Sequence, residues 1–176
     1  KMLQNSLVQS NLKTLRQNGA HIIAPKYDIL ACGDVGEGAL ADIDTIFFTA
    51  CRAFFQKPSC IGKTVIVTAG GTQETIDDFR CIANYSSGKQ GYFLALNAHL
   101  LGFDVVFIAS KTAGFLPADV KVLPFKTTKE LKMQLHSVKK ADFLLMCAAV
   151  SDFVCENPKK GKIKKIDQKS LTLKLK

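Results

Sequence analysis

The sequence contains no apolar run near the ~20 residues that a helix needs to cross a membrane. Its first residues, Lys1–Asn5, lack the apolar segment of a secretory signal peptide. The six cysteines include no C-x-x-C pair, and none has metal-ligand spacing to any of the three histidines. We therefore expect a cytoplasmic protein with reduced thiols, and neither a membrane protein, a disulfide framework nor a zinc protein.

Net positive charge is small over most of the chain, although the total net charge is +9. Residues 157–176 contain eight lysines against one acid, Asp167, so this segment carries +7 and everything before it only +2. A nucleic-acid-binding protein would instead spread basic residues over the face that follows the phosphate backbone. The local charge indicates a loop that meets a small anion, or a solvated segment, and we expect no nucleic-acid partner.

Two phosphate-binding signatures are also missing. Neither the G-x-G-x-x-G dinucleotide fingerprint nor the Walker A pattern occurs in the chain. The chain therefore lacks the glycine-rich turn that binds the cofactor of an NAD-dependent oxidoreductase, and the sequence does not favour that class of enzyme. A site for a nucleotide, if there is one, must be built from other residues.

From residue 64 onward, the sequence alternates strand and helix patterns. Short apolar runs predict strands at 64–68, 104–109, 120–125 and 142–147. Two helices are predicted between them. The first is capped by Ser86 or Ser87, and its buried face consists of Tyr92, Ala95, Leu96, His99 and Leu100. The second is capped by Thr127 or Thr128 and ends at Val138. Continuous apolar strands separated by helices predict an α/β fold, a Rossmann-like parallel sheet with helices on both faces. Alternation in 171–176 predicts one further strand.

The first part of the chain has a different character. We expect a helix around Leu7, Leu12 and Leu15, a glycine-rich turn at 31–38 and a closing helix at 40–46. The predicted organisation is therefore a C-terminal part of one domain at 1–55, a linker at 56–63 and an incomplete second domain at 64–176.

Three polar segments would meet beyond the carboxyl ends of the predicted strands, where open parallel sheets bind ligands. The first is Gly70-Gly71, whose backbone could approach an anion, or could simply form a tight turn. The second is residues 80–91, with Asn84 available to hold a carbonyl or acyl-phosphate oxygen and Arg80 to bind a carboxylate or phosphate through two donors. Its phosphate-binding candidates precede a helix: Ser86, Ser87, Gly88 and Lys89. A capped helix with a solvated Lys89 is the alternative.

The third segment is residues 146–153. Small residues after the fourth strand leave room for a flat ring, and Asp152 could bind a ribose hydroxyl or a metal, or cap a turn. The basic loop 161–165 would reach the same edge if it folds back. Together the three segments supply different parts of a nucleotide site.

The order of these motifs resembles the phosphopantothenate–cysteine ligase family. It runs V-T-A-G-G-T-x-E-x-I-D, R-x-I-x-N-x-S-S-G-K-x-G, A-A-V-x-D and K-I-K-K, from about Thr64 to the end. The earlier motif L-A-C-G-D-x-G-E-G resembles the end of the flavin-dependent phosphopantothenoylcysteine decarboxylases. Bacteria join these two activities in one bifunctional coenzyme A biosynthesis family. The chain would be a fragment that spans the junction.

The resemblance implies two activities and their cofactors. The ligase would activate 4′-phosphopantothenate with CTP and Mg²⁺ to an acyl-cytidylate, which cysteine then converts to the amide; the decarboxylase would use FMN. CTP is inferred from the fusion, since the residues do not separate it from ATP. A ligase-domain dimer is also implied. The alternative is a catalytically inactive nucleotide-binding fragment, and we expect poor activity from the chain alone.

The resemblance also assigns roles. Cys32 would donate a proton in the decarboxylase, and Asn84 and Lys162 would be catalytic in the ligase. Nucleotide contacts would come from Met146, Cys147, Ala148, Asp152 and Lys162. Phosphate and substrate contacts would come from Gly70, Gly71, Arg80, Asn84 and Ser86 to Lys89. One departure is that Ala39 and Leu40 follow Gly38 where the decarboxylases have an arginine, so that arginine's role has no counterpart.

Overall fold

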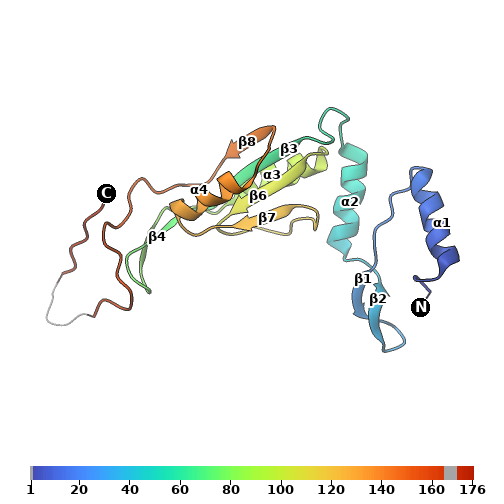
Figure 1. The fold of residues 1–176 in the computed structure, drawn as a ribbon, viewed down its shortest axis with the longest axis horizontal. Helices are drawn as coiled ribbons and strands as arrows, with labels where there is room; N and C mark the ends of the chain where they lie inside the picture. Colours follow the sequence, from blue (N-terminus) through green and yellow to red (C-terminus); the bar gives the residue numbers. More distant parts are fainter. Residues whose placement is uncertain (1, 165–169) are drawn as a thin grey trace. The chain divides into compact units, whose positions relative to one another are not determined.

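The computed structural model describes residues 2–164 and 170–176 and divides into two compact units, Lys1–Gln56 and Lys57–Lys176 (Figure 1). In the described residues, no helix is both long and apolar enough to span a bilayer.

The first unit contains two helices and one hairpin. Helix α1 (Ser6–Gln17) begins where the Asn5 side chain accepts a hydrogen bond from the N–H of Leu7. Strands β1 (Lys26–Ile29) and β2 (Val35–Ala39) pair antiparallel, and helix α2 (Ile43–Phe55) follows. The helix expected around Leu7 to Leu15 is confirmed.

Two expectations for this unit were wrong in detail. The glycine-rich turn is only the part around Gly33, whose φ is +85° and whose N–H donates to the carbonyl of Leu30 at 2.8 Å. Residues 35–39 form a strand, because their backbone finds its partners in β1. The closing helix begins at Ile43, after the extended residue Asp42, and not at residue 40.

The second unit is built on a four-stranded parallel sheet. Its strands are β3 (Thr64–Ala69), β6 (Asp104–Ala109), β7 (Lys121–Pro124) and β8 (Phe143–Met146), in the order β7-β6-β3-β8. The four predicted strands and the Rossmann-like parallel sheet are therefore confirmed. The strand order reverses between β3, the first strand of this sheet along the chain, and β8, its last.

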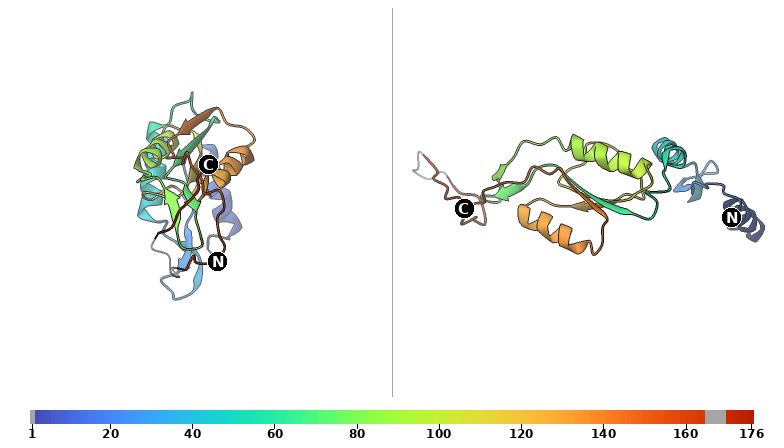
Figure 2. Two further views of the ribbon diagram at one scale, coloured as in Figure 1. Left: turned by 90° about the vertical axis from the view of Figure 1, so that its left-hand side faces the viewer. Right: turned by 90° about the horizontal axis from the view of Figure 1, so that it is seen from above.

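Helices cover both faces of this sheet, with α3 (Lys89–Leu100) on one side and α4 (Thr128–Ser137) on the other (Figure 2). The period of two in a strand sends alternate residues to opposite faces. Val65, Val67 and Ala69 pack with Tyr92 and Ala95 of α3. On the opposite face the core consists of Ile66, Val106, Ile108, Phe125 and Leu131. The predicted buried face of α3 is confirmed by Tyr92, Ala95 and His99.

The ends of the elements show one correct cap and one wrong cap. Thr127 caps α4 and forms a capping box with Glu130, as expected. The N-cap of α3 is Gly88 in a left-handed conformation, while Ser86 and Ser87 accept hydrogen bonds from the N–H groups of Gly88 and Lys89. The serines therefore stabilise the turn before the helix.

Two further features involve extended segments. The hairpin of β4 (Gln73–Thr75) and β5 (Cys81–Ala83) is additional to the predicted elements. The strand expected at 171–176 is present only as an isolated antiparallel bridge between Cys155 and Leu175.

Candidate functional site

The site lies where the strand order of the sheet reverses. Residues 70–72 leave the end of β3, and residues 147–152 leave the end of the neighbouring strand β8. In open parallel sheets, ligands bind in the crevice at such a reversal, outside the carboxyl ends of the strands. The expected meeting of the first and third segments at this edge is therefore present.

The turn Gly70-Gly71 is packed too closely for side chains. Gly70 has φ +87°, and a Cβ there would lie 2.0 Å from the Ser110 Oγ. A Cβ on Gly71 would lie 2.7 Å from the carbonyl oxygen of Asn84. Glycine is required here because backbone and side-chain atoms of neighbouring segments occupy the space.

A buried threonine in β3 organises the segment after β8. The Oγ1 of Thr68 accepts hydrogen bonds from the N–H of Cys147 (3.0 Å) and the N–H of Ala148 (3.1 Å). These two residues are predicted nucleotide contacts. Sequence reasoning passed over Thr68, although a hydroxyl inside an otherwise apolar strand was an available signal, since buried hydroxyls need partners.

A second buried threonine extends the same connection. Thr72 Oγ1 accepts from the N–H of Ser151 at 2.8 Å, and the N–H of Thr72 donates to the Ala149 carbonyl at 3.2 Å. The N–H of Ala149 in turn donates to the carbonyl of Gly70 at 2.8 Å. Residues 70–72 and 148–151 therefore form one hydrogen-bonded floor at the strand reversal.

The second predicted segment joins this floor. Asn84 donates from Nδ2 to the carbonyl of Val150 at 2.9 Å. A Cβ on Gly88 would lie 3.5 Å from the Gly70 nitrogen, so the start of α3 stands against the glycine turn. The N-terminus of a helix favours an anion. Lys89, exposed in the first turn of α3, adds positive charge there.

The remaining nucleotide candidates lie at the end of β8. Met146 is the last residue of the strand and is exposed, and its Sδ lies 3.9 Å from the Thr68 Oγ1. Cys147 and Ala148 are half-buried, and Asp152 is exposed. These residues lie in or directly after the strand that leads into the same floor.

Arg80 and Lys162 belong to a separate cluster, at the turn between β4 and β5. The Nη2 of Arg80 lies 2.5 Å from Asp77 Oδ2 and 2.9 Å from the carbonyl oxygen of Ile163. The Lys162 ammonium lies 5.5 Å from the centroid of the Phe79 ring, a cation–π distance. The Arg80 guanidinium therefore binds an internal carboxylate.

Asp77 is the charged centre of that cluster. Its side chain is fully buried. The Arg80 guanidinium holds the pKa of Asp77 well below its usual range; burial opposes this, and N–H groups of Ile163, Phe79 and Arg80 reinforce it. Asp77 was recognised from the sequence only as one residue of a motif, because its partner Ile163 is far away along the chain.

Another buried carboxylate connects the hairpin to α4. The Oε1 of Glu74 accepts from the N–H (2.8 Å) and the hydroxyl (2.7 Å) of Thr128, the first residue of the helix. A negative charge at a helix N-terminus is favourable. Glu74 was also overlooked as a positioning group.

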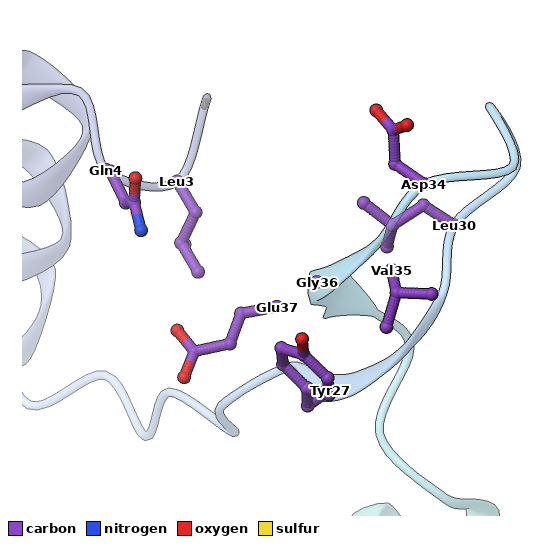
Figure 3. Close-up of a pocket in the computed structure, with 8 residues that line it drawn as sticks. All are labelled: Leu3, Gln4, Tyr27, Leu30, Asp34, Val35, Gly36 and Glu37. Atoms are coloured by element: carbon purple, nitrogen blue, oxygen red, sulfur yellow. The ribbon is translucent and has the colours of Figure 1, made fainter.

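Cys32 lies in the first unit, in the exposed turn between β1 and β2. A pocket of about 780 Å³ adjoins it, lined by Met2, Leu3, Val8, Pro25, Leu30, Ala31, Cys32, Glu37 and Gly38. A neighbouring pocket of about 460 Å³ lies between residues 3–4 and the hairpin, and Figure 3 shows Glu37 extending from the hairpin toward the side where Leu3 and Gln4 lie. The thiol therefore stands next to space that a small molecule can enter.

Within residues 2–164 and 170–176, no three His, Cys, Asp or Glu side chains gather closely enough to hold a metal ion.

Comparison with known proteins assigns the family. Residues 60–176 match the DNA/pantothenate metabolism flavoprotein C-terminal domain. The chain belongs to this family. Residues 1–54 match the family named Flavoprotein.

Among curated relatives, the coenzyme A biosynthesis bifunctional protein CoaBC of Haemophilus influenzae is 35% identical over 165 residues, which cover 93% of this chain and 41% of that protein. CoaBC of Mycobacterium tuberculosis (strain H37Rv) is 38% identical over 162 residues, covering 88% and 38%. The crystal structure of the C-terminal domain of CoaBC matches with a TM-score of 0.52 and 30% identity, covering 57% of this chain and 52% of that one. The chain spans about two fifths of the length of these two curated relatives. The resemblance to bifunctional coenzyme A biosynthesis proteins is thereby confirmed.

Proposed function

We propose that the polypeptide containing this chain acts in coenzyme A biosynthesis as a phosphopantothenate–cysteine ligase joined to a phosphopantothenoylcysteine decarboxylase. Residues 1–55 would be the end of the decarboxylase domain, 56–63 a linker and 64–176 an incomplete ligase domain. The observation that carries the proposal is the convergence of residues 70–72, 84–88 and 147–151 on one hydrogen-bonded floor at the strand reversal.

The ligase reaction has two displacements. A carboxylate oxygen of 4′-phosphopantothenate attacks the α-phosphorus of CTP, and the bond to pyrophosphate breaks. The cysteine amine then attacks the acyl carbon of the acyl-cytidylate, CMP leaves, and the amine releases a proton. Both steps need the reactants held in line and charge on the phosphates stabilised.

The residues at the floor suit these needs. The start of α3, with Ser86, Ser87 and Lys89, would bind phosphate, and Asn84 would hold the acyl group beside it. Met146, Cys147, Ala148 and Asp152 would border the cytidine. Lys162, from the separate cluster at the β4–β5 turn, would neutralise charge on the phosphate, for which a flexible ammonium is suited.

Two cofactors follow from the same proposal. Mg²⁺ would arrive on the triphosphate and neutralise its charge, since the described residues hold no cluster of three ligands for it. FMN would supply the redox chemistry of the decarboxylation. From this chain, Cys32 would hold a proton for that reaction on its exposed turn, beside the adjoining pocket.

A dimer of ligase domains is part of the proposal. Phe79 and Tyr85 project from the ends of β4–β5 with 69% and 107% exposure, which favours an apolar partner surface. Sedimentation of the full-length protein as a monomer at all concentrations would contradict the dimer.

The decisive experiment measures pyrophosphate release by the full-length protein with 4′-phosphopantothenate and either CTP or ATP. We expect release with CTP, and formation of phosphopantothenoylcysteine once cysteine is added. Asn84→Asp and Lys162→Ala should each reduce the rate at least ~100-fold, the scale of losing one oriented stabilising group. Normal rates in both variants would refute the assigned roles. Nucleotide binding without pyrophosphate release would identify an inactive nucleotide-binding module.

A further inference from the structure

The turn between β4 and β5 contains a buried carboxylate that the proposed reaction does not use. Asp77 Oδ1 accepts from the N–H groups of Phe79 (2.9 Å) and Arg80 (2.8 Å). Its Oδ2 accepts from Arg80 Nε (3.1 Å) and Nη2 (2.5 Å), and from the N–H of Ile163 (3.0 Å). Five donors therefore converge on one carboxylate, and one of them comes from a segment more than 80 residues away.

That distant segment, residues 159–163, is held at every second residue. The N–H of Lys159 donates to the carbonyl of Ile76 at 3.0 Å, and the N–H of Gly161 donates to Asp78 Oδ2 at 2.7 Å. At Ile163 both backbone groups are bound, the N–H by Asp77 and the carbonyl by Arg80 Nη2 at 2.9 Å. Figures 1 and 2 show the chain after β8 continuing beyond the sheet to the region of the β4–β5 hairpin.

Charge makes this attachment strong. Hydrogen bonds from N–H groups to an ionised carboxylate are shorter and stronger than neutral ones. The two carboxylates bind the main-chain N–H groups on either side of Lys162: Asp78 binds that of Gly161, and Asp77 binds that of Ile163. The Lys162 side chain then lies over the Phe79 ring of the same turn.

The turn is itself joined to the hydrogen-bonded floor of residues 70–72 and 148–151. Strand β4 follows directly from Thr72, and strand β5 leads directly to Asn84. Each strand has only three residues, so little chain separates the turn from either residue. A segment bound to the turn is therefore held at a defined distance from Asn84.

We propose that Asp77, acting with Arg80, is a positioning residue that holds the Lys162 segment in place relative to Asn84. Arg80 serves this role instead of binding substrate, because its Nε and Nη2 are directed to Asp77 and Ile163. The inference rests on the proposed function for the importance of Lys162, but the attachment itself does not depend on any activity.

The first test measures hydrogen exchange of the full chain in Asp77→Asn. An amide group can accept on one atom only, so it cannot satisfy donors on both Oδ1 and Oδ2, and its NH₂ faces the Arg80 guanidinium. We expect exchange at Gly161 and Ile163 to rise ~10-fold or more, with exchange in β3 and β6 unchanged.

Asp142→Asn is the matched control. Asp142 Oδ2 also accepts a main-chain N–H, that of Thr64 at 2.8 Å, but at the start of β3. The control should leave residues 161–163 protected. Equal protection of these residues in wild type, Asp77→Asn and Asp142→Asn would overturn the proposal.

A variant that fails to fold is covered by a second substitution. Arg80→Lys keeps the positive charge but removes the guanidinium Nη2, the atom that donates to the carbonyl of Ile163. If Asp77→Asn exposes the entire sheet to exchange, Arg80→Lys should still loosen residues 161–163 alone. No change in that segment in Arg80→Lys would then refute the positioning role.

The link to Lys162 is tested by a double-mutant cycle in the full-length enzyme. Asp77→Asn should lower kcat for pyrophosphate release with little change in KM for 4′-phosphopantothenate, and should add almost nothing in a Lys162→Ala background. If the reductions in kcat of the two single variants multiply in the double variant, Asp77 acts independently of Lys162, and the proposal is wrong. An inactive wild type would refute the proposed function, while the exchange result would still decide whether Asp77 holds the segment.

Discussion

The hydroxyl of Thr68 accepts a hydrogen bond from the main-chain N–H of Cys147 at 3.0 Å, across 79 positions of sequence. The two residues lie on neighbouring strands, β3 and the end of β8, where the strand order reverses. One side chain of β3 therefore shapes the segment after β8 that contains three predicted nucleotide contacts.

Replacing Thr68 by valine tests this connection. Valine has nearly the same shape but no acceptor, so the N–H groups of Cys147 and Ala148 would lose their partner. We expect the free energy of unfolding to fall by about 1–3 kcal/mol, and nucleotide affinity to fall with it. Denaturant unfolding and calorimetric titration with CTP measure the two effects. Thr68→Ser keeps the hydroxyl and should behave much more like wild type; equal loss in both variants would show that the methyl group matters instead.

Gly71→Ala should displace Asn84. The new Cβ would meet the Asn84 carbonyl oxygen at 2.7 Å, and a backbone atom cannot move aside as a flexible side chain can. Such overpacking costs about 1–3 kcal/mol. Thermal unfolding checks the cost. Gly36→Ala is the control, since its Cβ would lie 3.9 Å from the nearest heavy atom, the Leu30 Cδ1, and its melting temperature should hardly change.

Two substitutions of Glu74 measure separately what its hydrogen-bond acceptor and its charge contribute to stability. Its Oε1 accepts both hydrogen bonds from Thr128, and a glutamine oxygen can do the same. We expect Glu74→Gln to cost only the charge–helix contribution, about 0.3–1 kcal/mol. Glu74→Ala should cost about 1–3 kcal/mol because Thr128 loses its partner inside the protein. Equal destabilisation of the two variants in urea unfolding would refute this division.

Lys26 should titrate at unusually high pH. Hydrogen bonds to Asp42 and Asp28, both at 2.9 Å, raise the pKa of Lys26 from 10.5 to about 12. Because the folded-state pKa is raised, the stabilisation is fully present below pH 10.5 and is lost as the pH rises through about 12. Chemical shifts of the Lys26 Cε, followed by NMR against pH, measure the value. Asp42→Asn should move it back toward 10.5; an unchanged titration would contradict the cause given.

Much of the second unit was predictable, because burial leaves a local periodic pattern. The apolar runs of β3, β6, β7 and β8, the buried face of α3 and the capping box of α4 were all recognisable. The meeting of residues 70–72 with residues 148–151 at one edge also followed, since parallel strands end on the same side of a sheet, but the expected approach of Arg80 and the loop of Lys162 to that edge did not.

The two hairpins were not predictable in the same way. Strand β2 contains glycines and no alternating apolar pattern, and β4 and β5 have three residues each. Their strand character comes from backbone pairing with a partner segment, and composition alone does not reveal that partner.

The parallel sheet, its helices and the order of its motifs follow from the amino-acid sequence, because hydrophobic periodicity and capping act between near neighbours. Which distant residues meet depends on the tertiary structure: Thr68 and Thr72 bind the segment after β8, and Asp77 binds Ile163. Hydrogen bonds between residues about 80 positions apart depend on how strands are placed side by side. A polar residue in a motif indicates that a hydrogen-bond partner is needed, and only the fold shows which residue that partner is.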